Sequence, residues 1–289
     1  MGGDIYIPPK PKPEYKYALW YFKYTNTYEK EFNGTVDDLL NRGFNYAVTL
    51  EVSEGRYIPQ SGFSYDDGYN DGKELGKWLD SYLRGIDYFV AIPYYKEGSS
   101  NPGDKRGLDY WKGYIDGIYY NTSDYQIGFY WNLESCGQVK WGYITDYELN
   151  ELSNYIRNKH YQFIWIPSLG GRTIQQLEDS GVKNTMKYFN YVFCQPNYYQ
   201  RDTMQDGSEY TYDKLVEILN WIRKASQNSY IELEADNQVL SNPNKVLRAC
   251  DYVKAQKDSI VGDIWQRRAY YFDTKKEVID RVRRTCPEW

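Results

Sequence analysis

Short apolar runs alternate with longer amphipathic stretches along most of the chain. The runs are rich in Tyr, Trp, Phe, Val and Ile and are separated by turn-forming residues, which is typical of β-strands. Between the runs, apolar positions recur at helical spacing. The pattern predicts eight strands, over residues 17–22, 45–52, 88–93, 126–133, 162–167, 191–195, 230–234 and 268–272.

Helices are predicted between these strands, and several begin with Thr, Asp or Asn followed by acidic residues, as capped helices do. Strands that alternate with helices pair in parallel through right-handed crossovers. Eight such units are expected to close into a (β/α)8 TIM barrel. An open doubly wound sheet is the main alternative, but no Gly-x-Gly-x-x-Gly follows an early strand to mark a nucleotide crevice. The helices are expected over residues 35–40, 71–84, 104–118, 145–159, 173–178, 211–224, 242–255 and 274–284.

The length of 289 residues fits one barrel better than two small domains. Residues 1–14 are a Pro-rich lead-in, and residues 15–289 are expected to form the single barrel domain. The lead-in lacks the basic and then apolar pattern of an export signal. An export signal that has been removed stays an open alternative. We expect an extracellular or cell-surface location.

The charge balance narrows the choice of partners. The chain has 35 basic and 40 acidic residues and a net charge of -5, so it has no general field that would attract nucleic acid or an anionic membrane surface. No run approaches the length of a membrane span. The sequence leaves the oligomeric state open.

Composition also limits the chemistry. The single histidine, His160, precedes the fifth predicted strand and therefore belongs to the stability end of a barrel, which excludes histidine-dependent triads and histidine-ligated metals. The four cysteines do not have metal-ligand spacing. Cys250 falls in one of the last two predicted helices and Cys286 lies just after the other, and the two are expected to form one disulfide or to stay free thiols. We expect neither a metal nor an organic cofactor.

Two glutamates stand where a barrel carries its chemistry, because the carboxyl ends of the strands and the loops after them form the active face. Glu134 ends the run that begins at Gly128, and Glu234 ends the run that begins at Tyr230. If both side chains face the interior, they reach one cavity. Such a pair of carboxyl groups is what the hydrolysis of a glycosidic bond requires. We expect Glu134 to be the acid/base and Glu234 the nucleophile or base.

Each carboxyl group also has a structural interpretation, because a Glu at a strand end can cap the next helix or pair with an arginine such as Arg267. Glu232 shares the face of Glu234 but lies two residues deeper. A charge there needs a partner or a raised pKa. Glu232 is therefore either the nucleophile itself or a residue that orients its neighbour.

Amide and aromatic side chains near the same strand ends are candidates for binding sugar. Amides can donate to and accept from a hydroxyl, and aromatic rings can stack on a sugar ring, although a Trp near a barrel rim is as often part of the core. Asp236 has the alternative role of capping the next turn. The candidate substrate-binding residues are Asn132, Gln195, Asn197, Tyr198, Trp165, Tyr94, Glu51, Asp236 and Trp20.

Three blocks carry a family resemblance: Trp165-Ile-Pro with Gly170, then Gln195-Pro-Asn-Tyr-Tyr199, then Ile231-Glu-Leu-Glu234. In these blocks, and more loosely over most of the chain, the sequence resembles an uncharacterised family of bacterial and archaeal proteins. That family is a domain of unknown function regarded as a glycoside-hydrolase-like (β/α)8 barrel. The resemblance implies the fold and a carbohydrate-linked role, and it supplies no substrate.

A looser resemblance is to the large clan of retaining glycosidases. It implies an acid/base Glu after the fourth strand, directly after an Asn, and a nucleophile Glu at the end of the seventh. Glu134 and Glu234 occupy these strands, but Leu133 separates Asn132 from Glu134, which departs from the pattern of the clan.

The resulting hypothesis is a barrel that hydrolyses glycosidic bonds in a poly- or oligosaccharide by a two-carboxylate, retaining mechanism. Two other classes stay open. One is a catalytically inactive, carbohydrate-binding barrel in which the carboxyl groups lie too far apart. The other is a hydrolase that cuts another type of bond in a cell-envelope polymer.

Overall fold

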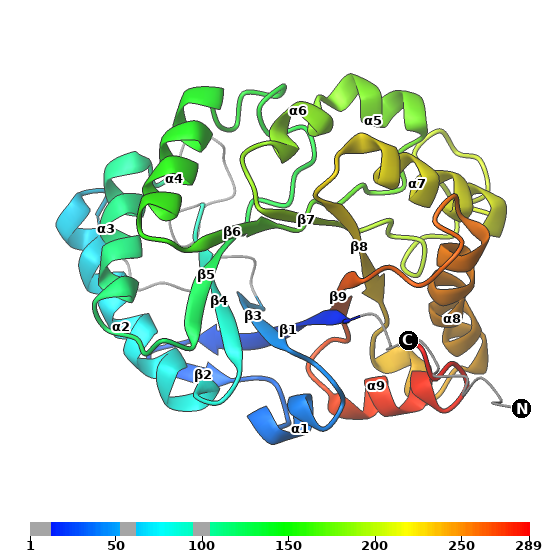
Figure 1. Cartoon of the computed structure of the whole chain (residues 1–289), viewed down its shortest axis with the longest axis horizontal. Helices are drawn as coiled ribbons and strands as arrows, with labels where there is room; N and C mark the ends of the chain where they lie inside the picture. Colours follow the sequence, from blue (N-terminus) through cyan, green and yellow to red (C-terminus); the bar gives the residue numbers. More distant parts are fainter. Residues whose placement is uncertain (1–12, 53–61, 95–104) are drawn as a thin grey trace, which may run out of the picture.

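Eight parallel strands close into a barrel, and helices surround it (Figure 1). A computed structural model describes residues 13–52, 62–94 and 105–289. All eight predicted strands are present, with boundaries shifted by at most a few residues, and the predicted (β/α)8 fold is confirmed. The barrel strands are β1 (Tyr15–Tyr24), β3 (Tyr46–Glu51), β4 (Asp87–Ile92), β5 (Gln126–Trp131), β6 (Gln162–Trp165), β7 (Tyr191–Cys194), β8 (Ser229–Glu234) and β9 (Arg267–Tyr271).

The first and last barrel strands pair directly, which closes the sheet. β1 and β9 are parallel, with Tyr17 opposite Ala269. A short strand that the sequence pattern did not predict, β2 (Tyr28–Lys30), pairs antiparallel with the end of β1. Of the predicted lead-in, residues 1–12 lie outside the described part of the chain.

The helices follow the strands as predicted, and most begin at a capping side chain. Thr35, Thr145, Thr173 and Thr211 each accept a hydrogen bond from a backbone N–H of the helix's first turn. The helices are α1 (Val36–Leu40), α2 (Tyr65–Leu83), α3 (Leu108–Tyr119), α4 (Asp146–Asn158), α5 (Ile174–Ser180), α6 (Val182–Met186), α7 (Tyr212–Ala225), the 3-10 helix η2 (Asn237–Leu240), α8 (Pro243–Asp258) and α9 (Lys276–Arg283).

Two helix starts were wrong. The third helix, α3, begins at Leu108 and not at residue 104. The second, α2, begins at Tyr65, capped by Ser64, and not at residue 71. Its first turns contain glycines that the helical pattern did not favour. Glycine is required in this helix because the backbone of α3 packs directly on these residues. A Cβ at Gly68 would lie 2.0 Å from the carbonyl oxygen of Tyr110, so no larger side chain fits there.

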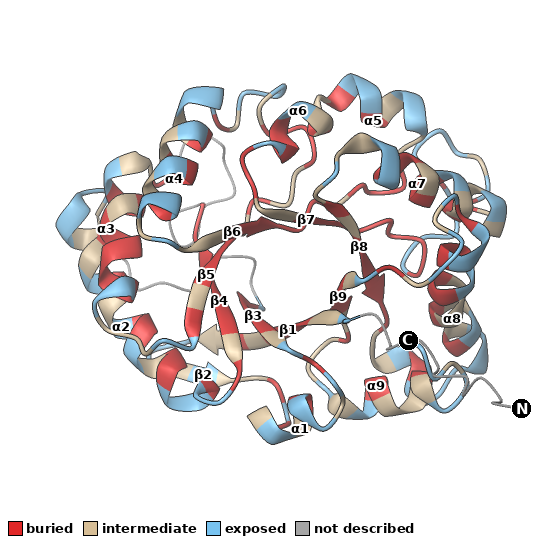
Figure 2. Cartoon of the chain, in the orientation of Figure 1, coloured by how far each residue is buried: buried red, intermediate tan, exposed pale blue. Residues whose placement is uncertain are grey.

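The strands separate two apolar layers because their side chains alternate between the barrel interior and the helices. The interior contains Leu19, Val48, Phe89 and Phe193, which are almost fully buried. The larger layer lies between strands and helices (Figure 2). The helices turn buried faces toward the barrel and exposed faces outward, as amphipathic helices do.

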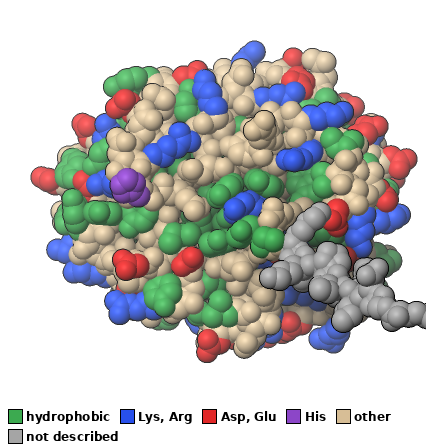
Figure 3. All heavy atoms as spheres, viewed as in Figure 1, with side chains coloured by type: hydrophobic (Ala, Val, Ile, Leu, Met, Phe, Trp, Pro, Cys, Tyr) green, Lys and Arg blue, Asp and Glu red, His purple; other side chains and the backbone are tan. Residues whose placement is uncertain are grey.

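Figure 3 shows the face at which the strands begin. His160, the single histidine of the chain, is exposed there, two residues before β6, at the end that the sequence predicted. Apolar side chains gather at the centre of this face. The first residues of β1, β7 and β9 meet, with the guanidinium of Arg267 4.0 Å from the ring centroids of both Tyr15 and Tyr191. This aromatic cluster belongs to the end of the barrel opposite the cavity described below.

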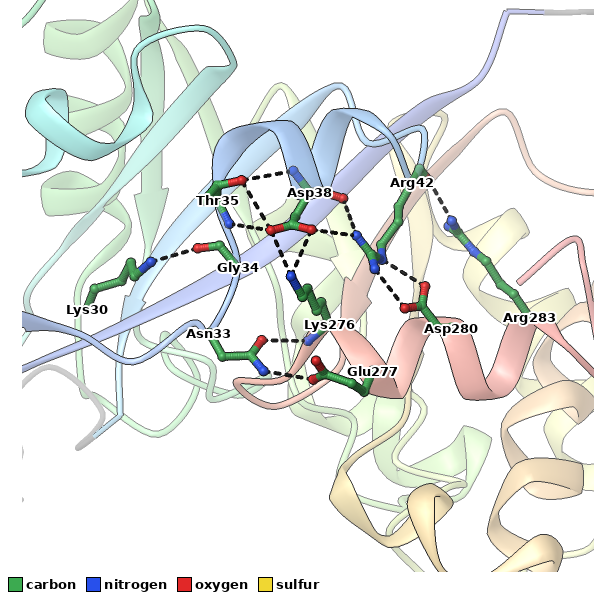
Figure 4. A network of polar contacts seen from close by, with 10 residues as sticks. All are labelled: Lys30, Asn33, Gly34, Thr35, Asp38, Arg42, Lys276, Glu277, Asp280 and Arg283. Carbon is green, nitrogen blue, oxygen red and sulfur yellow. Dashed lines mark hydrogen bonds and ion pairs between the residues drawn. The ribbon is translucent and has the colours of Figure 1, made fainter.

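Ion pairs join the first helix to the last (Figure 4). The carboxylate of Asp38 accepts from Lys276 Nζ at 2.9 and 3.0 Å and from Arg42 Nη1 at 3.2 Å. Arg42 in turn donates to both carboxylate oxygens of Asp280, at 2.8 and 2.7 Å. We call this network, formed by Asp38, Arg42, Lys276 and Asp280, the α1–α9 seam.

Two further findings concern the predictions made above. All four cysteines are free, including Cys250 and Cys286, for which a disulfide was one alternative. Among the described residues, no helix is both long and apolar enough to span a membrane.

Candidate active site

A cavity of about 400 Å³ opens at the carboxyl end of the barrel, where the sequence predicted the active face. Side chains from several strand ends and the loops after them form its wall. They are Leu19, Tyr21, Leu50, Glu51, Val52, Glu134, Ser168, Gln195, Asn197, Gln200, Glu232, Tyr271 and Asp273.

A second cavity of about 390 Å³ adjoins the first. The two share Leu50, Glu134 and Ser168, so Glu134 stands at their junction. The second cavity adds Tyr94, Asn132, Leu133, Ser135, Cys136 and Arg172.

Glu134, directly after β5, is held at both carboxylate oxygens. The hydroxyl of Tyr130 donates to Oε1 at 2.7 Å, and Nε2 of Gln195 donates to Oε2 at 3.1 Å. The backbone carbonyl of Glu134 accepts from the N–H of Ser168 at 2.8 Å, which ties this loop to the one after β6. Donors at both oxygens suit an ionised carboxylate, and they fix its direction.

Glu232, inside β8, has a different environment. Its side chain is only 1% exposed, and Oε2 has no hydrogen-bond partner in the part of the chain that the structure describes. Burial raises the pKa of Glu232 well above its usual range, and the negative charges of Glu234 and Glu134 add to the effect. Burial therefore favours the protonated form of Glu232, and this residue lies at the wall of the cavity.

Glu234, the last residue of β8, is fully buried and lines neither cavity. The hydroxyl of Tyr252, from α8, donates to Oε2, and Nδ2 of Asn197 donates to Oε1 at 3.4 Å. Burial raises the pKa of Glu234 to about 7, although these hydrogen bonds work in the opposite direction. The sequence predicted that Glu134 shares a cavity with Glu234, with Glu232 as the alternative, and the structure has Glu134 and Glu232 in the wall of the same cavity. The helix that packs over the end of β8 makes the difference, because it encloses the outer of the two glutamates.

Asn197 joins the loops after β6, β7 and β8. Its Oδ1 accepts from the hydroxyl of Ser168 at 3.0 Å and from the N–H of Gly170 at 2.5 Å. Its Nδ2 lies 3.4 Å from both Gln195 Oε1 and Glu234 Oε1. The backbone of Asn197 has a φ of 59°, in the left-handed region that Asn tolerates better than most residues. A continuous set of hydrogen bonds therefore runs from Glu134 through Gln195 and Asn197 to Glu234.

Three more of the predicted binding residues lie in the cavity walls. Asn132 lines the second cavity, and its Oδ1 accepts from the N–H of Tyr94 at 3.0 Å. Tyr94 lines the same cavity and donates its hydroxyl to the carbonyl of Tyr143. Glu51 lines the first cavity and is 2% exposed.

Four of the predicted binding residues lie elsewhere. Trp165 is fully buried between strands and helices, where it stacks on Phe189, and Trp20 is buried in the same layer. Both rings face the outer layer because of strand alternation, so neither offers a surface to a ligand.

Tyr198 and Asp236 make structural hydrogen bonds away from the two cavities. The hydroxyl of Tyr198 donates to Asp251 at 2.9 Å. Asp236 caps η2 through the N–H of Gln238 and accepts from the hydroxyl of Tyr199 at 2.6 Å. Capping was the alternative role that the sequence left open for Asp236.

The candidate set drawn from the sequence missed several residues of the site. Tyr130 precedes Glu134 by four positions, so strand alternation could have placed its hydroxyl on the same face. Tyr21 and Tyr271 continue the interior faces of β1 and β9 in the same way. Tyr252 gives no comparable signal, since it lies on a helix and reaches Glu234 only through tertiary packing. Among the residues that the structure describes, no group of three His, Cys, Asp or Glu side chains could hold a metal ion.

Known proteins resemble this chain at two levels. Residues 118–288 match the model of the family described as domain of unknown function DUF4855. An uncharacterized protein of Methanocaldococcus jannaschii is 45% identical over 353 aligned positions, which cover 100% of this chain and 100% of the relative.

Solved structures resemble the chain more distantly. A GH18 chitinase from Pseudoalteromonas aurantia is 10% identical, with a TM-score of 0.51, and the match covers 94% of this chain and 99% of the chitinase. A fungal beta-1,4-galactanase is 12% identical, with a TM-score of 0.46, and the match covers 89% of this chain and 88% of the galactanase. At this identity the chitinase supports the barrel fold alone, and the score of the galactanase is too low to carry an argument.

Proposed function

The chain belongs to the DUF4855 family, and we propose that it is a glycoside hydrolase that cleaves a poly- or oligosaccharide with Glu134 and Glu232. The observation that carries the proposal is the pairing of two unlike carboxyl groups in one cavity at the carboxyl end of the barrel. Glu134 accepts hydrogen bonds at both oxygens, whereas Glu232 is buried with one oxygen free. Two carboxyl groups whose surroundings favour opposite protonation states are the acid and the base of such a reaction.

The environments assign the roles differently from the sequence. Glu232 holds a proton at neutral pH and is the general acid, which protonates the oxygen of the leaving sugar. Glu134 is the ionised partner, which attacks the anomeric carbon or activates a water molecule. Tyr130 and Gln195 keep the Glu134 carboxylate aimed at the junction of the two cavities. Glu234 then acts as a buried support for Asn197 and does not touch the substrate.

The rest of the wall suits a sugar. Gln195 and Gln200 offer amide groups, Ser168 a hydroxyl, and Tyr21 and Tyr271 aromatic rings, all in the first cavity. Such groups can hydrogen bond neutral hydroxyls and pack against the apolar faces of a ring. A polymeric substrate would fit the extracellular or cell-surface location, which stays a prediction.

The test is a panel of poly- and oligosaccharides incubated with the wild type, Glu134→Gln and Glu232→Gln. We expect new reducing ends with the wild type and a loss of roughly 10²- to 10⁴-fold in turnover with each variant, because an amide keeps the shape but cannot transfer the proton. Circular dichroism of each variant would show that the fold is kept.

The same assay separates the alternatives. Products with a new amine and no reducing end, detected by mass spectrometry, would indicate a hydrolase of another bond. Binding of a glycan without cleavage by the wild type would indicate an inactive carbohydrate-binding barrel. The anomer first released, followed by NMR, tests the predicted retention of configuration.

A further inference from the structure

The first cavity is lined by acidic groups from four different strands or the loops after them. Glu51 ends β3, Glu134 follows β5, Glu232 lies in β8 and Asp273 follows β9. The described residues of this wall include no lysine and no arginine. Carboxylates that converge from separate elements are not brought together by any one stretch of sequence, so the folded barrel creates this concentration of negative charge.

A second observation indicates that the cavity receives a polar ligand. Among the described residues, Oε2 of Glu232 has no hydrogen-bond partner, and the Glu232 side chain lines the cavity. A buried polar group without a partner costs free energy, and native structures keep few of them. Glu232 therefore brings an unpartnered polar side chain to the cavity wall, where a polar group of a ligand can meet it.

The negative field extends across the cavity to its aromatic groups. Burial raises the pKa of Tyr21 well above its usual range, and the charges of Glu134 and Asp273 add to the effect. The pKa of Tyr271 is also raised, first by burial and then by the charge of Asp273 among others. Groups on two different strands therefore experience the same excess of negative charge.

We infer that the substrate is an oligosaccharide whose sugar units carry free, protonated amino groups, and that the first cavity binds one of these ammonium groups. The inference rests on the proposed function and names its substrate class. An ammonium group has three donors and one positive charge. The wall offers carboxylates for the charge and the side-chain oxygens of Gln195 and Gln200 as further acceptors. An N-acetylated unit of the same sugar is neutral and would gain nothing from the field.

The acidic groups of the wall have a competing explanation, which requires only the hydrolysis reaction and no charged substrate. The transition state of glycoside hydrolysis has oxocarbenium character and is positively charged, so carboxylates around it would assist cleavage of any sugar. On that explanation a neutral sugar binds as well as an amino sugar. Measuring how tightly the uncleaved sugars bind, before any transition state forms, therefore distinguishes the two explanations.

The experiment is isothermal titration calorimetry with β-1,4-linked tetramers of glucosamine, N-acetylglucosamine and glucose. The host is Glu232→Gln, which blocks turnover and leaves the charge of the cavity unchanged because Glu232 is protonated in the wild type. We expect the glucosamine tetramer to bind roughly tenfold or more tightly than either neutral tetramer, because one charge pair in a partly buried site contributes at least this much. Added salt should reduce the preference.

A pair of variants locates the effect. Asp273→Asn, in the same host, removes one carboxylate of the wall, and Asn suits the φ of 56° at this position. We expect it to lower the preference for the amino sugar several-fold while leaving the binding of the neutral tetramers nearly unchanged. Asp87→Asn removes the same charge at the first residue of β4, at the other end of the barrel, and should leave the preference intact.

Equal binding of the three tetramers, or tighter binding of a neutral one, would overturn the inference and leave the proposed function standing. An equal loss of preference in Asp273→Asn and Asp87→Asn would also overturn it, since the net charge and not the cavity would then be responsible. No cleavage of any glycan by the wild type, together with selective binding of the amino tetramer, would overturn the proposed hydrolysis and support the binding specificity.

Discussion

The barrel mouth and the α1–α9 seam both contain acidic side chains, but the surroundings shift the pKa values of these side chains in opposite directions. In the seam, Asp38 lies against Lys276 and Arg42, and its hydrogen bonds, first of all the one from Lys276, hold the pKa of Asp38 well below its usual range (Figure 4). At the mouth, Glu232 and Glu234 have no basic partner among the described residues; burial raises both pKa values, and a neighbouring carboxyl group adds to the effect.

The difference separates charges that support the fold from charges that are available for chemistry. A paired carboxylate at the rim of the protein adds modestly to stability and is satisfied by its partners. A buried carboxyl group without a cation destabilises the fold, and it is found mainly where protonation has a use. By this criterion the barrel mouth is the functional site that we propose, whereas the seam closes the ring of helices.

The largest effect expected from this contrast is in the pH dependence of turnover. If Glu232 is the general acid, turnover on a cleaved glycan should fall by about tenfold for each pH unit above the raised pKa of Glu232, because the proton is lost. Initial rates from about pH 5 to about pH 10 would measure this. A rate that stays constant or rises over the alkaline range would show that Glu232 is not the acid.

The second expected effect is on stability and concerns Glu234. Its pKa is about 7 in the folded chain, against an ordinary value of 4.5, so the folded state holds the proton more tightly than the unfolded state. The contribution to stability is complete below pH 4.5 and is lost as the pH rises through about 7, a total of roughly 3 kcal/mol.

Urea unfolding at about pH 4 and about pH 8 tests this effect in the wild type and in Glu234→Gln, which has no proton to lose. The loss of unfolding free energy between the two pH values should be smaller in the variant by that amount. Glu232 titrates in the same direction in both proteins, and because the charge of Glu234 helps to raise the pKa of Glu232, the difference between the two proteins measures Glu234 together with this coupling. The same loss in both proteins would contradict the expectation.

The smallest expected effect lies in the seam. Asp38→Asn should lower the free energy of unfolding at neutral pH by about 1 kcal/mol, since it removes a partly exposed ion pair that salt screens. The pKa of Asp38 is lowered in the folded state, so its contribution is present above the ordinary value of 3.8 and is lost as the pH falls. Asp37→Asn, on the exposed side of the same helix, is the matched control and should change stability little. Two equally stable variants would mean that the seam contributes nothing measurable.

The amino-acid pattern predicted the barrel correctly, and there is a physical reason for this. Alternating apolar positions and helix caps are local signals, so the strands and most helices could be predicted from neighbouring residues. Where the local signal fails, a distant element decides. The first turns of α2 contain Gly68, which a helix disfavours, and the structure keeps them helical because α3 packs against that glycine.

Within the site, the sequence determined which strands end in carboxyl groups, and alternation determined that Glu232 and Glu234 share a face of β8. It did not determine which of the two faces the cavity, because that depends on Tyr252 from α8 and Asn197 from the loop after β7. It left open whether Trp165 and Trp20 bind sugar or belong to the core, and the structure buries both between strands and helices. Periodicity along the chain specifies the face of a strand on which a side chain lies. The burial, the hydrogen-bond partners and the pKa of that side chain depend on residues far away in the sequence, which only the closed barrel brings together.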